Sequence, residues 1–227
     1  MAAQRLPGKP LLKINNLPII SHVVDRAKDS GVGEVVVCAE DKEIVSVVEK
    51  NGGKAILTGS HHKNGTERIY EGIKKLKKKG IDFVLSLQGD EPTVEPKDIV
   101  RLNNLMIENN AEIGTLAAEI KNESMMKNRN VVKVITKEKL NNYNFAKASN
   151  FLRIYESKEN LNIYHHIGIY CYKFSILEKF VALDRTENEI KNSLEQLRAL
   201  DNNININVAL ASTSPIGIDT NEDYLEL

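Results

Sequence analysis

The stretch Phe83-Val84-Leu85-Ser86-Leu87-Gln88-Gly89-Asp90-Glu91-Pro92 decides the fold. Its first half is apolar and typical of a buried strand, and its second half is polar, with Pro92 preventing the strand from continuing. In α/β sheets, ligands bind beyond the carboxyl ends of the strands, which is where this pattern puts Asp90. A carboxylate there is a candidate ligand for Mg²⁺, although Gly-Asp pairs also form ordinary turns. The rest of the chain decides between these two interpretations.

Strand-like and helix-like runs alternate before this stretch. Apolar residues recur at helical spacing over 19–27, and Gly31 offers a helix stop. A strand is expected over 34–39, then a helix capped by Asp41, then a short strand over 54–58. Strands and helices at this spacing predict βαβ units, an α/β fold and a mostly parallel sheet.

Two glycine-containing loops carry residues that could hold phosphate. Arg5 and Lys9 flank Gly8, and an arginine for bidentate contacts beside a lysine point charge suits a polyphosphate. A frayed basic terminus is the ordinary alternative for such a start. Gly65 and Thr66 open another helix, where backbone N–H groups and a hydroxyl can face a nucleotide. A plain helix cap explains that second pattern equally well.

Beyond residue 110 the alternation of strands and helices is lost. Strand-like runs separated by polar insertions predict an irregular lobe over about 111–172, within a single domain spanning 1–227. Such a lobe is a place for a second substrate or a partner subunit. His166 lies in a strand-like run of this lobe, and in isolation a histidine there is more often structural than catalytic.

Two features near the end of the chain bear on the site. Apolar spacing predicts one helix over 188–200, with Glu195 and Arg198 on its polar sides. Its apolar face would consist of Ile190, Leu194, Leu197 and Leu200. Asp219 ends a later apolar run, and beside Asp90 it would give two carboxylates for one or two Mg²⁺ ions. The sequence alone cannot bring these two acids together.

Composition and charge limit the function classes. The 227 residues carry 31 basic and 31 acidic side chains, so bulk charge does not point to nucleic acid. No apolar run has the length of a membrane span, and no secretory signal is recognised. Cys38 and Cys171 lie in apolar runs without zinc spacing, which is typical of reduced thiols. We therefore expect a soluble, cytoplasmic protein without nucleic-acid or membrane partners.

Six short motifs occur in register along nearly the whole chain, and together they are more specific than any one alone. They are Arg5–Leu11, Gly65–Arg68, Gln88–Pro92, His166–Tyr170, Leu194–Arg198 and Ile218–Thr220. With them the chain resembles the 3-deoxy-manno-octulosonate cytidylyltransferase family of Gram-negative bacteria.

The resemblance implies both a fold and a reaction. The fold would be a three-layer α/β nucleotidyltransferase of Rossmann-like type, with a smaller sugar-binding and dimerisation lobe, assembled as a homodimer. The enzyme would transfer CMP from CTP to the anomeric hydroxyl of the eight-carbon acidic sugar Kdo. The products would be pyrophosphate and CMP-Kdo for lipopolysaccharide biosynthesis, with Mg²⁺ as cofactor.

The resemblance also implies roles for individual residues. Those expected to be catalytic, with the two aspartates holding Mg²⁺, are Arg5, Lys9, Asp90 and Asp219. Those expected to bind the nucleotide or the sugar are Gly65, Thr66, Arg68, Gln88, Lys147, His166, Tyr170, Glu195 and Gln196.

Two departures from the family pattern motivate alternatives. The family's first strand, an apolar run ending in an arginine before the phosphate loop, has no counterpart here, so an N-terminal strand is expected to be missing. Lys147 stands where the family usually has an arginine, which loses the planar fork of the guanidinium. The first departure leaves an inactive, truncated nucleotide-binding homologue as an alternative. The second leaves a cytidylyltransferase for amino-Kdo or another ulosonic acid.

Overall fold

The computed structural model describes residues 8–156, 161–214 and 224. Contacts group the described residues into two compact units, one from residues 8–81, 86–100 and 224, the other from 82–85, 101–156 and 161–214. Arg5 and Asp219 lie outside the described residues, so their roles stay predictions. The single domain over 1–227 with a lobe at about 111–172 also stays a prediction.

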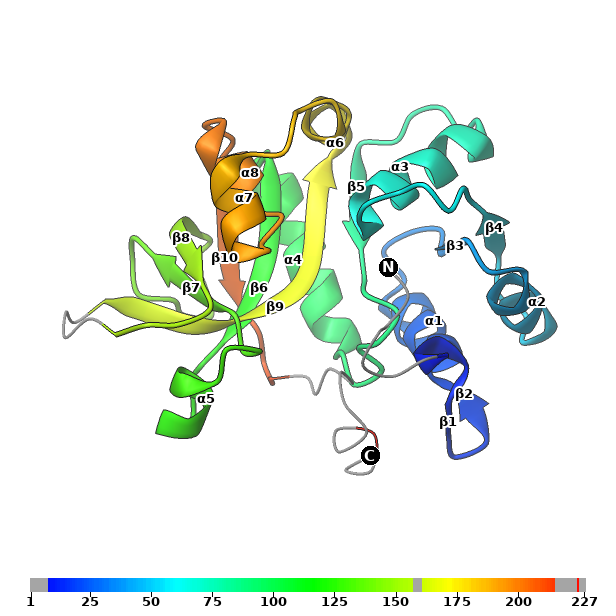
Figure 1. Cartoon of the computed structure of the whole chain (residues 1–227), viewed down its shortest axis with the longest axis horizontal. Helices are drawn as coiled ribbons and strands as arrows, with labels where there is room; N and C mark the ends of the chain where they lie inside the picture. Colours follow the sequence, from blue (N-terminus) through cyan, green and yellow to red (C-terminus); the bar gives the residue numbers. More distant parts are fainter. Residues whose placement is uncertain (1–7, 157–160, 215–223, 225–227) are drawn as a thin grey trace. The chain divides into compact units, whose positions relative to one another are not determined.

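The first unit contains the alternation of strands and helices expected from the sequence. β3 and β4 pair in parallel and are joined by α2, which is the expected βαβ connection (Figure 1). The elements of this unit are η1 (Lys9–Leu11), β1 (Lys13–Ile14), β2 (Leu17–Pro18), α1 (Ile19–Ser30), β3 (Val37–Ala39), α2 (Lys42–Lys50), β4 (Ala55–Leu57) and α3 (Gly65–Leu76).

The helix ends of this unit follow from local sequence. α1 ends at Gly31, whose φ of +63° lies in the left-handed region that glycine adopts without a Cβ penalty. The Asp41 carboxylate accepts a hydrogen bond from the Glu43 N–H at 2.8 Å and caps α2. The Asn64 side chain accepts one from the Glu67 N–H at 2.8 Å and caps α3. The expected stop at Gly31 and cap at Asp41 are confirmed.

The second unit is built on a sheet with strand order β5-β9-β6-β10-β8-β7. Its strands are β5 (Phe83–Ser86), β6 (Ile113–Ala118), β7 (Lys133–Thr136), β8 (Ala146–Leu152), β9 (Asn162–Lys173) and β10 (Ile206–Leu210). The last residue of β5, Ser86, is grouped with the first unit. The helices of the second unit are α4 (Pro96–Glu108), α5 (Glu123–Lys127), α6 (Phe174–Val181), α7 (Glu187–Asn192) and α8 (Leu197–Asp201). The part of α4 before Arg101 is grouped with the first unit. No helix of the described residues is both long and apolar enough to cross a bilayer.

The strands of this sheet correct the expectation of a mostly parallel sheet. β6 and β10 are parallel, but β9 is antiparallel to β6 and β7, and β8 is antiparallel to β10 and β7. β7 leads to β8 through a loop over 137–145 that contains no helix. Parallel neighbouring strands need a long crossover connection, usually a helix. The short loop between β7 and β8 therefore makes these two strands antiparallel. The α/β class is confirmed, and the mostly parallel pairing is wrong for this unit.

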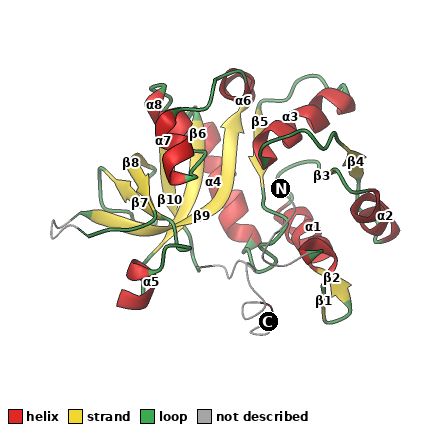
Figure 2. Ribbon diagram, viewed as in Figure 1, coloured by secondary structure: helices red, strands yellow, loops and turns green. Residues whose placement is uncertain are grey.

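Helices lie on both faces of the six-stranded sheet. Figure 2 shows α7 and α8 on one face and α4 on the other. α4 approaches β6 closely at Gly114, where a Cβ would lie 2.5 Å from Met106 Sδ and 2.7 Å from Phe145 Cζ. A larger residue would therefore force these packed side chains to move. The three-layer arrangement implied by the resemblance is confirmed.

The single helix expected over 188–200 is wrong. Ser193 has a φ of +52° and ends α7, and α8 begins at Leu197 after a turn. Ile190, expected on the apolar face, is 54% exposed, and Arg198, expected on a polar side, is 1% exposed. In one straight helix, residues nine apart would be separated by about 13.5 Å along the axis. The break lets the chain fold back, so that Arg198 meets Glu189.

The pair Glu189–Arg198 is buried and geometrically well formed. Arg198 donates from Nε to Oε2 at 2.7 Å and from Nη2 to Oε1 at 2.8 Å, and Arg185 donates to the same carboxylate at 2.8 Å. The Arg198 guanidinium also lies 4.8 Å from the ring centre of Phe180. Burial would raise the pKa of Glu189, but the bonds from Arg198 and Arg185 lower it overall, so the carboxyl is ionised at neutral pH.

Glu189→Gln is expected to lower the free energy of unfolding by about 3–5 kcal/mol, because it leaves a buried guanidinium without its charge partner. Urea unfolding measures this loss. Glu187→Gln, an exposed change on the same helix, is the matched control. Equal losses in the two variants would contradict the interpretation. Glu189→Leu combined with Arg198→Met should cost less than Glu189→Gln alone, because no unpaired charge remains.

Candidate active site

In the first unit, Lys9 and Asp90 lie in direct contact although 81 residues separate them in sequence. Gly8, with a φ of +68°, turns the chain into η1 and places Lys9 inward, at 7% exposure. Lys9 Nζ donates to Asp90 Oδ2 at 2.6 Å, and the Asp90 side chain stays 31% exposed. Two residues that were predicted to be catalytic are therefore neighbours. Their roles in the reaction stay predictions.

The turn that carries Asp90 is packed tightly onto α1. A Cβ on Gly89 would lie 3.2 Å from Ile20 Cδ1, so a larger residue here would require the Ile20 side chain to shift by a few tenths of an ångström. Gln88 is exposed, and its carbonyl accepts a hydrogen bond from the Glu91 N–H at 3.4 Å. A partly exposed carboxylate on a fixed turn can accept a hard cation such as Mg²⁺.

The first turn of α3 is open to a ligand. A Cβ on Gly65 would meet no atom within 4 Å, whereas Thr66 is buried at 6% exposure. Glu67 accepts a hydrogen bond from the Lys63 N–H at 2.9 Å, and Asn64 caps the Glu67 N–H, so the loop before the helix is held from both sides. A helix N-terminus that is open in this way favours phosphate oxygens.

Arg68 ties three parts of the first unit together. Its Nη1 donates to Thr58 Oγ1 at 2.8 Å and to the Gly59 carbonyl at 3.1 Å, and its Nη2 binds the Glu40 carboxylate. These bonds join α3 to the residues that follow β3 and β4. The structure thus gives Arg68 a positioning role, and its predicted contact with substrate stays a prediction.

In the second unit, an irregularity in β9 lies between His166 and Tyr170, whose ring centroids are 5.4 Å apart. The register with β6 shifts after Thr115, so that Tyr170 pairs with Thr115 and His166 with Ala117. The Thr115 hydroxyl donates to the Ile169 carbonyl at 2.7 Å and lies 3.2 Å from His166 Nε2. This buried hydroxyl satisfies a carbonyl of the irregular segment and also orients the imidazole.

His166 is packed among aromatic rings. Its ring and that of Phe151 form a T-shaped pair with centroids 5.1 Å apart, and the Tyr170 ring centroid lies at 5.4 Å. Burial, and then the neighbouring His165, lower the pKa of His166 to about 3. A neutral imidazole can exchange hydrogen bonds with hydroxyl groups, but it does not supply a proton at neutral pH.

The other predicted sugar-binding residues lie elsewhere in this unit. Lys147 is exposed on β8, and its Nζ donates to Asn205 Oδ1 at 3.2 Å. Glu195 and Gln196 lie in the turn between α7 and α8. Their part in substrate binding stays a prediction.

Two basic residues, Arg153 and Lys133, hold the turn between α7 and α8 in place, and the sequence patterns did not single them out. Arg153 donates to the carbonyls of Asn192 and Ser193 at 3.0 and 2.9 Å, at the end of α7. Lys133 is fully buried and donates to the Arg153 carbonyl at 2.9 Å; burial lowers the pKa of this lysine. A lysine inside the apolar strand run 131–136 was the signal that could have drawn attention to it.

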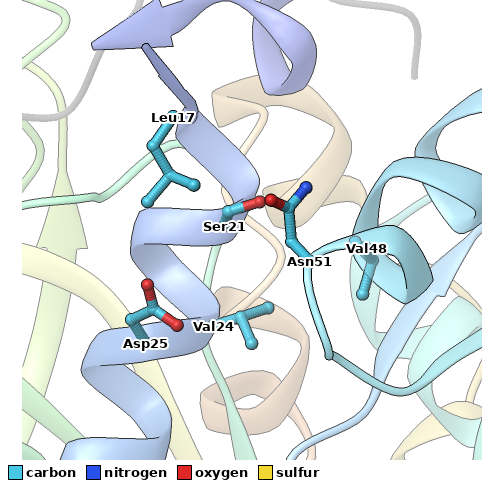
Figure 3. Close-up of a pocket in the computed structure, with 6 residues that line it drawn as sticks. All are labelled: Leu17, Ser21, Val24, Asp25, Val48 and Asn51. Atoms are coloured by element: carbon cyan, nitrogen blue, oxygen red, sulfur yellow. The ribbon is translucent and has the colours of Figure 1, made fainter. Parts of the chain in front are cut away.

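A small hollow of about 60 Å³ lies between α1 and the end of α2 in the first unit (Figure 3). It is lined by Leu17, Ser21, Val24, Asp25, Val48 and Asn51. In Figure 3 the Asn51 side chain points toward Ser21, while Val24 and Val48 close the space between the helices. The hollow is too small for a nucleotide, and it contains none of the predicted site residues.

Comparisons with known proteins agree with the motifs. A sequence profile described as cytidylyltransferase matches residues 1–206. A 3-deoxy-manno-octulosonate cytidylyltransferase from Thermodesulfovibrio yellowstonii is 43% identical over 96% of this chain and 90% of its own length. One from Brucella anthropi is 41% identical over 98% of this chain and 90% of its own length. The solved structure of CMP:2-keto-3-deoxy-manno-octonic acid synthetase complexed with CTP is similar at a TM-score of 0.87 and 32% identity, covering 98% of this chain and 91% of that one.

The low pKa of His166 leads to a pH dependence of stability. In the folded state His166 stays neutral down to a pH of about 3, whereas in the unfolded chain it takes up a proton near pH 6.5. Stability from this group is therefore present above pH 6.5 and lost as pH falls, by about 2 kcal/mol between pH 7 and pH 5. NMR should show no titration of the His166 ring between pH 5 and pH 8. A midpoint near 6.5 in the folded protein would contradict the burial argument.

Proposed function

Because the chain belongs to the 3-deoxy-manno-octulosonate cytidylyltransferase family, we propose that it transfers CMP from CTP to the anomeric hydroxyl of Kdo, with release of pyrophosphate. The observation that carries this proposal is the contact between Lys9 and Asp90 in the first unit, at the two motifs that the family pattern assigns to the triphosphate and the metal. The open first turn of α3 is a second support, because it offers backbone N–H groups to a nucleotide.

The proposed chemistry needs positioning and charge rather than a covalent intermediate. The sugar hydroxyl attacks the α-phosphate in line as pyrophosphate leaves, and negative charge develops on phosphate oxygens. Lys9 is nearly buried and carries the positive charge suited to these oxygens. Neither Cys38 nor Cys171 takes part as a nucleophile in this scheme; burial raises the pKa of both thiols, to about 11 and about 12.

We propose Mg²⁺ as the cofactor, held by Asp90 together with Asp219. Asp90 fits this role because its carboxylate is partly exposed on a fixed turn beside a cation. Asp219 lies outside the described residues, and its part rests on the family motif. When bound, Mg²⁺ would neutralise phosphate charge and lower the pKa of the attacking hydroxyl.

We propose that the acidic sugar lies against the residues assigned to it in the second unit. Neutral His166 and the adjacent Tyr170 suit sugar hydroxyls, and Lys147 offers a cation to a carboxylate. Glu195 and Gln196, on the turn that Arg153 holds, complete the proposed set. We place the enzyme in the cytoplasm, as a homodimer that light scattering at micromolar concentration would detect.

The first experiment measures pyrophosphate release from CTP and Kdo with Mg²⁺. Parallel reactions replace CTP with UTP, or Kdo with amino-Kdo or sialic acid. We expect release with CTP and Kdo alone, because the motifs match a CTP- and Kdo-dependent family. Release with another acidic sugar would favour the alternative acceptor. Absence of release with every sugar, in a chain that still binds CTP in calorimetry, would favour the inactive nucleotide-binding homologue.

Asp90→Asn should lower the turnover number by roughly 10²–10³-fold, because the neutral amide loses the charge that holds a cation at the reacting phosphate. Binding of CTP should survive in part, since Lys9 and the α3 N-terminus remain. Stopped-assay pyrophosphate release measures the rate and calorimetry the binding. Asp29→Asn, at an exposed position on α1, is the control. Near-normal turnover in Asp90→Asn would exclude Asp90 as the metal ligand.

A further inference from the structure

His61, His62 and Glu71 form a cluster of three metal-ligating side chains in the first unit. One potential ligand atom from each lies within 4.8 Å of those of the other two. The two imidazole rings lie 4.3 Å apart between centroids, and His62 Nε2 is hydrogen-bonded to the Glu71 carboxylate. His61 is exposed, whereas the side chains of His62 and Glu71 are 9% and 22% exposed. The proposed catalytic scheme does not use any of the three.

The backbone around Gly59 shapes this cluster. The Gly59 N–H donates to both oxygens of Glu71, at 3.0 and 3.2 Å, and so fixes the carboxylate. A Cβ on Gly59 would lie 2.5 Å from the His61 ring, so the absence of a side chain makes room for that imidazole. Bonds from Lys75, His62 and Gly59 lower the pKa of Glu71 to about 2, and the carboxylate is therefore ionised. A fixed carboxylate beside two imidazoles has the donors of a metal centre.

We propose that His61, His62 and Glu71 bind a Zn²⁺ ion or a similar borderline transition-metal ion. Two imidazole nitrogens and one carboxylate oxygen are a ligand set that suits Zn²⁺, and a water molecule would complete four-coordination. Mg²⁺ prefers a set made of oxygens, so this site and the proposed one at Asp90 would take different metals.

The geometry requires a small rearrangement of the side chains. Ligand bonds of about 2.0–2.2 Å place tetrahedral ligand atoms about 3.3 Å apart. His62 and Glu71 must separate slightly to admit the ion, which takes the place of the proton in their hydrogen bond. His61 must move inward, and its ring is exposed to solvent. Because the ion replaces protons, binding should weaken as pH falls.

Lys75 would compete with a metal ion for the Glu71 carboxylate. Its Nζ lies 2.6 Å from Glu71 Oε1 and also donates to the Leu57 carbonyl at 2.7 Å. When a metal ion binds Glu71, the ammonium can keep the second bond and move away from the carboxylate. A purely structural hydrogen-bond cluster would be weakened by loss of Lys75, whereas a metal site should bind its ion more tightly without it.

A bound ion would connect the loop over 58–64 to the body of α3. This loop leads into Gly65 and Thr66, where we place the nucleotide. The loop carries His61 and His62, and Glu71 lies two turns into the helix. The ion would therefore fix the loop over 58–64, which leads into the nucleotide-binding turn, without contacting the reacting atoms.

The test is a titration of the full chain, without an affinity tag and after treatment with EDTA, with Zn²⁺ in a calorimeter. Co²⁺ absorption in the visible range reports on tetrahedral nitrogen and oxygen ligands. We expect one equivalent of Zn²⁺ whose affinity falls by at least about tenfold in His61→Gln and in Glu71→Gln. Lys75→Met should bind Zn²⁺ more tightly. His22→Gln, which removes a histidine far along the sequence in α1, and Asp90→Asn should leave this equivalent unchanged.

Several outcomes would overturn the proposal. One is the absence of Zn²⁺ binding by the unmodified chain, and another is an equivalent that His61→Gln leaves unchanged. Loss of the equivalent in Asp90→Asn would place the ion at Asp90 instead. His61 is exposed, so His61→Gln should keep the fold, and circular dichroism checks that a loss of binding is not a loss of structure.

Discussion

The contact between Lys9 and Asp90 is the constraint on which the proposed nucleotide site depends. Lys9 is only 7% exposed, and its Nζ donates to Asp90 Oδ2 at 2.6 Å. Removing the Asp90 carboxylate would leave the buried Lys9 ammonium without this charge partner, whereas the Asp90 side chain is 31% exposed and partly solvated. The contact also joins η1 to the turn that carries Asp90, two segments far apart in the chain. Gly8 and Gly89 make the contact possible, one by its left-handed backbone and the other by its close approach to Ile20.

Buried or partly buried cations have the same organising effect in the second unit. Arg198 binds Glu189, Arg153 binds the carbonyls at the end of α7, and Lys133 binds the carbonyl of Arg153. Arg153 and Lys133 bind backbone carbonyls near the helix break and the end of β8, whereas Arg198 neutralises a buried carboxylate. The turn with the proposed sugar ligands Glu195 and Gln196 is therefore held by charge as well as by apolar packing.

Specific residues show how far the sequence could predict the site. Lys9 and Asp90 were each predicted to be catalytic, and the structure brings them into contact, while their roles stay predictions. The strand containing His166 was predicted, but its neutral, aromatic surroundings depend on Phe151 and Thr115 from other strands. The cluster of His61, His62 and Glu71 was not predicted, because its two parts meet only when the loop folds onto α3.

Local sequence by itself determined the helix caps at Asp41 and Asn64, the stop at Gly31 and the strand before Asp90. It also carried the motifs that predicted the family, because these features depend on residues a few positions apart. The tertiary structure alone decided the antiparallel pairing of β7, β8 and β9, the break at Ser193 and the burial of Arg198. These depend on partners that are distant in sequence, and hydrogen-bond pairing and charge pairing are settled by which segments meet in space. An apolar periodicity can predict a helix over 188–200. It cannot show that this helix is broken and that the break allows Arg198 to pair with Glu189.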